Sequence, residues 1–174
     1  SSSNGTSTNG NGVYIAGTTA NITGLTFSSG MAVNNNGDGM YVANGKNYNI
    51  IGNQFCQNNQ ANVSKHGLEI GAGVTNLTIS NNTSSDCWAG GGSNKQLYGI
   101  LVNTGSSDYY TIVGNNLTGN VTGSLSDGGT GTNKFVANVA PVLVANSTGV
   151  SGFSNNTLIY SDAVSYTHLR AHTT

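Results

Sequence analysis

The chain of 174 residues carries very little charge. Only 6% of its residues are Asp, Glu, Lys or Arg, and the formal net charge is −1. Proteins that bind nucleic acid usually present a basic patch or stripe to the phosphates, so this composition argues against such a partner. No run of about 18 apolar residues occurs either, so we expect no membrane span.

The sequence also lacks the 3.6-residue apolar period that is typical of an amphipathic helix, so we expect almost no helix. Gly, Asn, Ser and Thr dominate the composition, which on its own would suit a disordered chain. Periodic Ile, Val and Leu residues argue against disorder. Their alternation with polar residues, and the abundance of β-branched side chains, indicate strands.

One short phrase recurs along the chain: a glycine, an apolar residue, a variable residue and a second apolar residue. Four copies are clear and a fifth is weaker, and they end at Ile15, Val42, Ile70, Val102 and Val144. The steps between these ends are 27, 28, 32 and 42 residues. Such a period is typical of a solenoid, in which each turn of the chain, or rung, packs on the next.

A second apolar phrase follows each copy, for example Ile50-Ile51-Gly52-Asn53-Gln54-Phe55. Strands that recur at this interval cannot pair as hairpins, but they can stack in parallel about 4.8 Å apart. We therefore predict an all-β fold, a right-handed parallel β-helix (solenoid) of about five rungs. One inward wall is predicted to contain Ile51, Ile79 and Val113. A structural row of stacked amides is predicted at the turns, formed by Asn53, Asn81, Asn115 and Asn155.

The repeat pattern also predicts the domain organisation. Residues 1–11 are a Ser/Asn/Gly-rich entry that we expect to continue an upstream rung, so the chain is expected to be a fragment of a longer protein. Residues 12–162 are expected to form a single β-helix domain with longer loops at 83–97 and 118–140. Residues 163–174 break the pattern and resemble a translated sequencing adapter. We expect this tail to be non-native, so its His168, Arg170 and His172 are not site candidates.

The two cysteines, Cys56 and Cys87, lie in loops of neighbouring rungs. A disulfide requires a Cα separation below about 7 Å, which neighbouring rungs can provide. In the repeat alignment, however, Cys56 matches Ser84, so Cys87 is out of register. This offset argues against a disulfide. The cysteine spacing does not suggest a metal site either, and we expect no metal and no cofactor.

The residue before each repeat glycine is the most specific candidate position. It is Asn11, Asp38, His66 and Tyr98 in successive copies. Asp38 and His66 should lie one strand spacing apart, about 5 Å between backbones, which allows a carboxylate–imidazole hydrogen bond. A purely structural reading is also open, because Asp38 can bond its own turn and His66 can satisfy a loop carbonyl.

The next outward line contains Tyr14, Tyr41 and Glu69. Aromatic side chains beside carboxylates suit sugar rings, whose apolar faces stack on aromatic rings. Glycosidases need two carboxyl groups about 5–10 Å apart. The backbones of Asp38 and Glu69 should be about 11 Å apart, so their side chains would have to close the gap.

From these lines we take Asp38, His66 and Glu69 as candidate catalytic residues. Candidate substrate-binding residues come from the outward lines and from the longer loop at 83–97, since loops on a rigid scaffold often carry function. They are Tyr41, Asp86, Trp88 and Tyr98. For Trp88, a sugar platform and a loop-packing anchor are equally open interpretations.

Three segments resemble a known family: "GDGMYVANGKNYNIIGNQF", "HGLEIGAGVTNLTISNN" and "SDGGTGTNK". On them, residues 12–160 resemble right-handed β-helix repeat proteins of the pectate-lyase-like superfamily, of the phage tailspike and tail-fibre type. The resemblance implies a homotrimer on a virion tail, or another extracellular location. It also implies a carbohydrate partner, a host surface polysaccharide.

Polygalacturonase-type glycoside hydrolases provide a second, more distant resemblance. The segment Lys65-His66-Gly67 is similar to their Gly-His-Gly motif, and Asp38 falls at an aspartate of the preceding motif. Asn11 stands where a further Asp would be, and Leu101-Val102-Asn103 replaces Arg-Ile-Lys. We therefore predict a polysaccharide-binding tailspike-like module, with a glycoside hydrolase as the alternative enzyme and a polysaccharide lyase less favoured. A surface or adhesin solenoid without a glycan partner is the third possibility.

Overall fold

The chain forms only β-strands and connecting segments in the residues that the computed structural model describes, which are 10–16, 22–85, 87 and 95–139. All of them belong to one compact unit, Ser1–Pro141. Every pair of strands in the two sheets is parallel. The predicted all-β class with parallel strands and without helices is therefore confirmed for this part of the chain.

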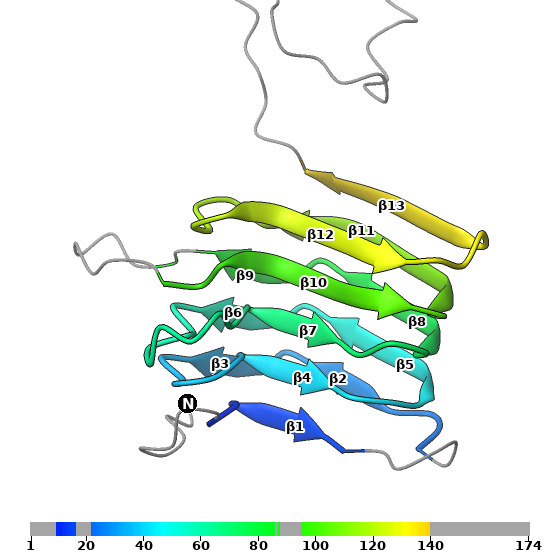
Figure 1. Ribbon diagram of the computed structural model, residues 1–174, viewed down its shortest axis with the longest axis horizontal. Coiled ribbons are helices and arrows are strands. Elements are labelled where there is room, and N and C mark those ends of the chain that lie inside the picture. Colours follow the sequence, from blue (N-terminus) through cyan, green and yellow to red (C-terminus); the bar gives the residue numbers. More distant parts are fainter. Residues whose placement is uncertain (1–9, 17–21, 86, 88–94, 140–174) are drawn as a thin grey trace, which may run out of the picture. The chain divides into compact units, whose positions relative to one another are not determined.

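The strands stack as five successive repeat units, which we call rungs 1 to 5 (Figure 1). The rungs comprise β1–β3, β4–β6, β7–β9, β10–β11 and β12–β13. The first sheet takes one strand from each rung, in the order β1-β4-β7-β10-β12. The second has the order β2-β5-β8-β11-β9-β6-β3, with β13 paired to β11. The strands of the first sheet are β1 (Val13–Ile15), β4 (Met40–Val42), β7 (Leu68–Ile70), β10 (Tyr98–Gly105) and β12 (Gly123–Gly129).

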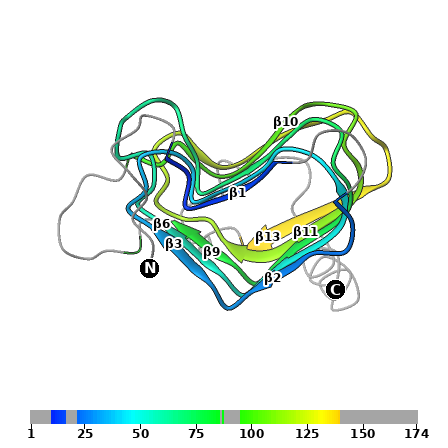
Figure 2. The ribbon, with the colours of Figure 1, turned by 90° about the horizontal axis from the view of Figure 1, so that it is seen from below.

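The second sheet supplies one or two short strands in each rung. They are β2 (Thr26–Ser28), β3 (Met31–Val33), β5 (Lys46–Ile51), β6 (Gln54–Cys56), β8 (Thr75–Ser80), β9 (Thr83–Ser85), β11 (Asp108–Asn116) and β13 (Lys134–Val139). Figure 2 looks along the stack and shows the two sheets facing one another. In this view the first sheet bends inward between two outward bends of the chain.

The core lies between the sheets and is built from equivalent residues of successive rungs. The first sheet contributes fully or almost fully buried apolar residues at the two apolar positions of the repeat phrase, namely Met40, Val42, Leu68, Ile70, Ile100 and Val102. Full burial of each such side chain contributes about 1.5–3 kcal/mol relative to exposure. The repeat phrase therefore marks the inner wall of the first sheet.

The inner wall of the second sheet contains Ile79 as predicted, but in the neighbouring rungs it is displaced by one residue from the sequence prediction. Ile50 pairs with Ile79, which pairs with Ile112, and all three are fully buried. Ile51 and Val113, which were predicted inward, are only partly buried. Since side chains alternate along a strand, a one-residue error in alignment turns the wrong residue toward the core.

The repeat glycine is required because the rungs approach closely at this position. A Cβ atom on Gly39 would lie 2.5 Å from the carbonyl oxygen of Gly67, and one on Gly67 would lie 2.8 Å from that of Gly99. Real Cβ atoms do not approach other heavy atoms so closely. The first residue of the phrase is thus fixed by backbone stacking and not by flexibility.

A row of buried amides connects the rungs at a bend of the second sheet. The backbone N–H of Asn53 donates to the side-chain oxygen of Asn82, and that of Asn82 donates to the side chain of Asn115, both at 2.9 Å. Asn115 continues the row to Asn138. The predicted amide row is present, but its third-rung member is Asn82 and not Asn81.

Asn81 has a different role at the same bend. Its φ is 55°, and the preceding and following rungs place Gly52 and Gly114 there with φ of 68° and 66°. Asn tolerates this left-handed conformation better than most residues with a side chain. The predicted member Asn155 lies outside the described residues.

A second amide row was not predicted. It runs through Asn35, Asn58, Gln96 and Asn120, joined by side-chain hydrogen bonds of 2.8–3.1 Å. Its members follow no common sequence phrase, so the repeat alignment did not reveal it.

The expected long loop at 118–140 is wrong, because most of it forms rung 5. Strand β12 pairs with β10 through Ile100 and Leu125, and β13 pairs with β11 through Ile112 and Val136. The segment lacks a clear copy of the repeat phrase, so its strands were taken for an insertion. The weak fifth copy at 141–144 lies outside the described residues.

Candidate functional site

The residues before the repeat glycines form a third polar row, at the start of the first-sheet strands. The backbone N–H of Asp38 donates to Asn11 Oδ1 at 2.8 Å, and that of His66 donates to Asp38 Oδ1 at 2.7 Å. The Tyr98 N–H then donates to His66 Nδ1 at 3.3 Å. Asp38 and His66 are therefore neighbours, but they are joined through the backbone and not by the expected carboxylate–imidazole hydrogen bond.

The three candidate catalytic residues lie together. Oxygen and nitrogen atoms of Asp38, His66 and Glu69 all lie within 4.8 Å of one another. The Asp38 and Glu69 side chains thus close the gap expected between their backbones. Asp38 is fully buried, and His66 and Glu69 are 6% and 9% exposed.

Lys65 completes this cluster, and sequence reasoning did not foresee its role. Its Nζ lies 3.1 Å from Asp38 Oδ2 and 3.4 Å from Glu69 Oε2. Asn103 donates a hydrogen bond of 2.8 Å to Glu69 Oε1. Two signals in the sequence could have indicated these contacts. Lys65 and Glu69 are four residues apart, and the repeat pairs the strand of Glu69 (β7) with the strand of Asn103 (β10).

The two carboxyl groups have pKa values that are shifted in opposite directions. Burial and the neighbouring Glu69 charge raise the pKa of Asp38 to about 7. Burial also acts to raise the pKa of Glu69, but the Asn103 hydrogen bond, the Lys65 charge and the adjoining Asp38 side chain lower it overall. Near neutral pH the cluster therefore holds an ionised Glu69 beside an Asp38 that carries a proton much of the time.

His66 is neutral at physiological pH. Burial lowers its pKa to about 4, despite the opposing charge of Glu69. A neutral imidazole accepts the Tyr98 N–H at Nδ1, so Nε2 is the nitrogen that carries its proton.

The donor set resembles a metal site in composition, since it offers two carboxylates and an imidazole. However, the Lys65 ammonium forms ion pairs with both carboxyl groups, and His66 Nδ1 is engaged by the Tyr98 N–H. The positive charge that a metal ion would supply is already provided by the chain.

An aromatic line borders the cluster on the outer face of the first sheet. The register places Tyr14 beside Tyr41, Tyr41 beside Glu69, and Glu69 beside Leu101. The rings of Tyr14 and Tyr41 stack at a centroid distance of 5.4 Å, and Tyr14 is 57% exposed. Lys65 Nζ lies 5.7 Å from the Tyr41 ring centre.

Tyr98, another candidate binding residue, stacks on His66 at 5.6 Å and is partly buried. The candidates Asp86 and Trp88 lie outside the described residues. The structure thus brings together Asp38, His66, Glu69, Tyr41 and Tyr98 on neighbouring rungs of the first sheet.

The expectation that the cysteines do not pair is wrong: Cys56 and Cys87 form a disulfide, with a Cα separation of 5.5 Å. Cys56 pairs in register with Ser85, not with Ser84 as the alignment assumed. Cys87 is therefore only two residues beyond the partner of Cys56, and the short segment after β9 brings it within bonding distance.

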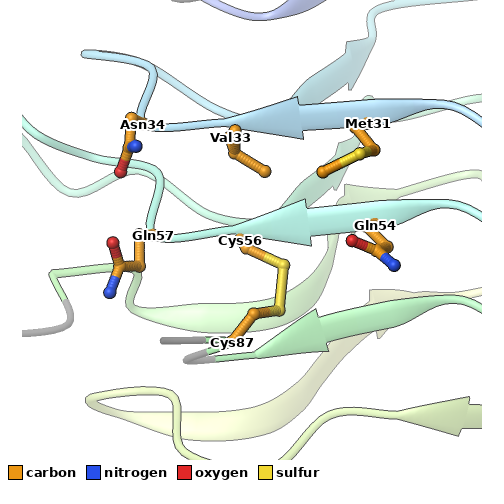
Figure 3. A pocket seen from close by; sticks show the side chains of 7 residues that line it. All are labelled: Met31, Val33, Asn34, Gln54, Cys56, Gln57 and Cys87. Carbon is orange, nitrogen blue, oxygen red and sulfur yellow. A yellow bond between two sulfur atoms is a disulfide. The ribbon is translucent and has the colours of Figure 1, made fainter. Parts of the chain in front are cut away.

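The disulfide borders a small pocket on the outer face of β3 and β6 (Figure 3). The pocket has a volume of about 150 Å³ and is lined by Met31, Val33, Asn34, Gln54, Cys56, Gln57 and Cys87. It belongs to the second sheet, so the carboxylate cluster and the pocket use different sheets.

A second lysine–carboxylate pair lies in rung 5. Lys134 Nζ is 2.9 Å from Asp127 Oδ2, and the Tyr110 hydroxyl donates to Asp127 Oδ1 at 2.5 Å. Burial and the bond to Asp127 raise the pKa of Tyr110 to about 12. Among the described residues Lys134 forms an ion pair with one carboxyl group, whereas Lys65 forms ion pairs with two.

Comparison with known proteins gives no relative for this chain. No family model matches it, and no curated protein or solved structure does so either. Within the described residues, no helix is long and apolar enough to cross a membrane. The site must therefore be judged on its own geometry.

Proposed function

We propose that these rungs belong to a right-handed parallel β-helix of the tailspike type, which binds a cell-surface polysaccharide along the outer face of the first sheet. The observation that carries this proposal is the stacked pair Tyr14–Tyr41, which is in register with Glu69. An aromatic ring buries the apolar face of a sugar at low entropic cost. The neighbouring carboxylate and amide of Glu69 and Asn103 offer hydrogen-bond partners for hydroxyl groups.

The arrangement of polar and apolar groups supports a neutral or weakly charged glycan. The cluster beside the tyrosines already pairs Lys65 with its carboxyl groups, so no uncompensated basic patch is available there for a polyanion. The disulfide supports an extracellular or virion-surface location, since such bonds persist in oxidising environments. Trimer formation is part of the tailspike proposal, and light scattering of the purified chain tests it.

Binding to a panel of capsular and O-antigen polysaccharides tests the main proposal. We expect the substitutions Tyr14→Ala and Tyr41→Ala each to weaken binding about 5- to 150-fold, as loss of a stacked aromatic contact of about 1–3 kcal/mol would do. Tyr109→Ala is the matched control, because Tyr109 is 60% exposed but lies on β11 of the second sheet. Equal losses in all three variants, or no binding to any glycan, would contradict the proposal.

A glycoside hydrolase is the second candidate, favoured by the opposite pKa shifts of Asp38 and Glu69. Paired acids with separated pKa values are typical of general acid and base roles. Against this, Asp38 is fully buried and its Oδ1 accepts the His66 N–H. Release of new reducing ends that is lost in Glu69→Gln would establish hydrolysis. Glycan binding without new ends supports the binding module, and the absence of both favours a purely structural solenoid.

A further inference from the structure

Lys65 is held against a buried carboxyl group of the preceding rung. Its Nζ lies 3.1 Å from Asp38 Oδ2, and Asp38 is fully buried. Asp38 Oδ1 accepts the His66 N–H, whereas Oδ2 makes no hydrogen bond of good geometry to any described residue. The second carboxyl group, that of Glu69, also contacts this ammonium, with Oε2 at 3.4 Å from Nζ.

An amine in contact with a buried carboxylic acid, and a second carboxylate that can accept the proton of the amine, are the components of an amide condensation. We propose that Lys65 and Asp38 form an intramolecular amide bond between rungs 2 and 3, with Glu69 as the proton carrier. The bond would join the segment before β4 to the segment before β7. It does not depend on glycan binding.

The reaction needs no partner beyond these three side chains. The Lys65 ammonium passes one proton to the Glu69 carboxylate and becomes a neutral amine. Its lone pair attacks Cγ of the protonated Asp38, and a C–N bond forms. The C–O bond to the Asp38 hydroxyl then breaks, and the hydroxyl leaves as water with a proton from the nitrogen, relayed by Glu69. One water is lost, and Glu69 finally returns its extra proton to solvent.

The protonation states support this sequence of steps. The raised pKa of Asp38 keeps it a neutral acid below about pH 7, and a neutral acid is open to attack whereas a carboxylate is not. For Lys65, burial lowers the pKa, but the two carboxyl groups outweigh burial and raise it. The neutral amine therefore arises by transfer to Glu69 and not by loss of a proton to solvent.

The surroundings favour a unimolecular reaction. Lys65 Nζ lies 3.1 Å from Oδ2 of the carboxyl group that it would attack. Reacting atoms that are held about 3–3.5 Å apart and aligned reach effective molarities of about 10⁵–10⁸ M. Lys65 Nζ lies over the Tyr41 ring, 5.7 Å from the ring centre. His66, whose backbone N–H bonds to Asp38, is neutral near pH 7 because its pKa is lowered to about 4. As pH rises through about 7, Asp38 ionises, so bond formation should slow.

The Lys134–Asp127 pair provides an internal control. Its N–O distance of 2.9 Å is shorter, but both side chains are more exposed, at 29% and 21%. The group bonded to Asp127 is the Tyr110 hydroxyl, and Asp108, on which the Lys134 charge also acts, forms no ion pair with Lys134 among the described residues. Proximity alone would link both pairs, whereas the proposed chemistry links only Lys65 to Asp38.

Intact mass spectrometry of the full 174-residue chain, after reduction of its disulfide, tests the proposal. We expect a mass lower by one water, and a proteolytic digest should contain one branched peptide that joins Lys65 to Asp38. Lys65→Arg keeps the positive charge but cannot form this bond, so it should show its full calculated mass. A folded wild-type chain that keeps its full mass after prolonged incubation at pH 6 would overturn the proposal.

Two further variants test the chemistry. Asp38→Asn should link with the loss of one ammonia in place of one water, which the mass distinguishes. Glu69→Gln keeps the shape of the side chain but cannot accept the Lys65 proton, and its linked fraction should fall at least 10-fold. Linking in Glu69→Gln at the wild-type rate would remove Glu69 from the mechanism. A link at Lys134 as well would show that proximity, and not the buried acid pair, drives the reaction.

Discussion

The amide row at the bend of the second sheet and the row before the first-sheet strands both satisfy polar groups between rungs, but with different side chains. Asn53, Asn82 and Asn115 use neutral amides throughout. The first-sheet row begins with Asn11 and then replaces the amide with Asp38 and His66. Since Asn11 shows that an amide suffices there, the titratable groups are not needed for stacking alone. The difference separates a row of neutral amides from a row that contains titratable side chains.

The largest effect is expected in the structural row. Asn82→Ala removes the acceptor of Asn53 and the donor to Asn115 inside the core. Each buried polar group left without a partner costs about 1–3 kcal/mol, so the free energy of unfolding should fall by about 3–5 kcal/mol. Chemical denaturation measures this value.

Asn49→Ala is the control for Asn82→Ala. Asn49 lies on β5, the strand that precedes this bend, but its side chain is exposed. Exposed substitutions usually change stability by less than about 0.5 kcal/mol. If both variants lose the same stability, the amide row does not hold the rungs together.

The second prediction concerns pH. His66→Asn keeps an acceptor for the Tyr98 N–H, as Asn11 provides one for Asp38. The folded pKa of His66 is lowered to about 4, below its ordinary value of 6.5, so its contribution to stability is present above pH 6.5 and is lost as pH falls toward 4. The wild type should therefore lose stability relative to His66→Asn over this range.

Denaturation at pH 7.5, 5.5 and 4.5 measures that difference. The free energy of unfolding of Asn82→Ala should follow the same pH dependence as that of the wild type and be lower by a constant amount, because the row of Asn82 contains no titratable group. Parallel pH profiles for the wild type and His66→Asn would show that the imidazole does not titrate with folding, and the two rows would then be equivalent.

The smallest effect is expected for Asn103→Ala. Its hydrogen bond is one of the causes that lower the pKa of Glu69. Removing it should raise that pKa and cost about 1 kcal/mol of stability, because Asn103 is only half-buried. Carboxyl NMR titration follows Glu69 directly. An unchanged Glu69 titration would show that Lys65 alone sets its ionisation.

The sequence predicts this fold well where the repeat has a strict physical cause. The glycines at 39, 67 and 99 cannot accept a Cβ, so the repeat phrase can be recognised in the sequence. Aligning the phrases places Asp38 next to His66 in the neighbouring rung. The prediction is wrong by one residue at Asn82 and Ile50. Each is next to a residue of its own type, Asn81 and Ile51, so two alignments of the repeat are equally acceptable. Only pairing distinguishes them, since both residues of each pair have the same chemistry.

Other features depend on side-chain reach, which repeat spacing does not encode. The long Lys65 side chain spans from its own rung to Asp38, and it contacts both carboxyl groups. The repeat spacing gave only a distance between their backbones and left open whether the side chains would meet. The sequence argued against the disulfide because of a register error of one residue, since Cys56 pairs with Ser85. Rung 5 was missed because residues 123–139 satisfy the same pairing without the glycine phrase.

The disulfide has a mechanical consequence. A stack of parallel rungs that is pulled from its two ends should lengthen by releasing one rung after another. The chain between Cys56 and Cys87, a separation of 31 residues, cannot extend while the bond is intact. A pulling force therefore cannot extend about 100 Å of the chain's contour length until the disulfide is reduced. A module that holds a surface under flow or shear would keep its middle rungs closed after its outer rungs had yielded.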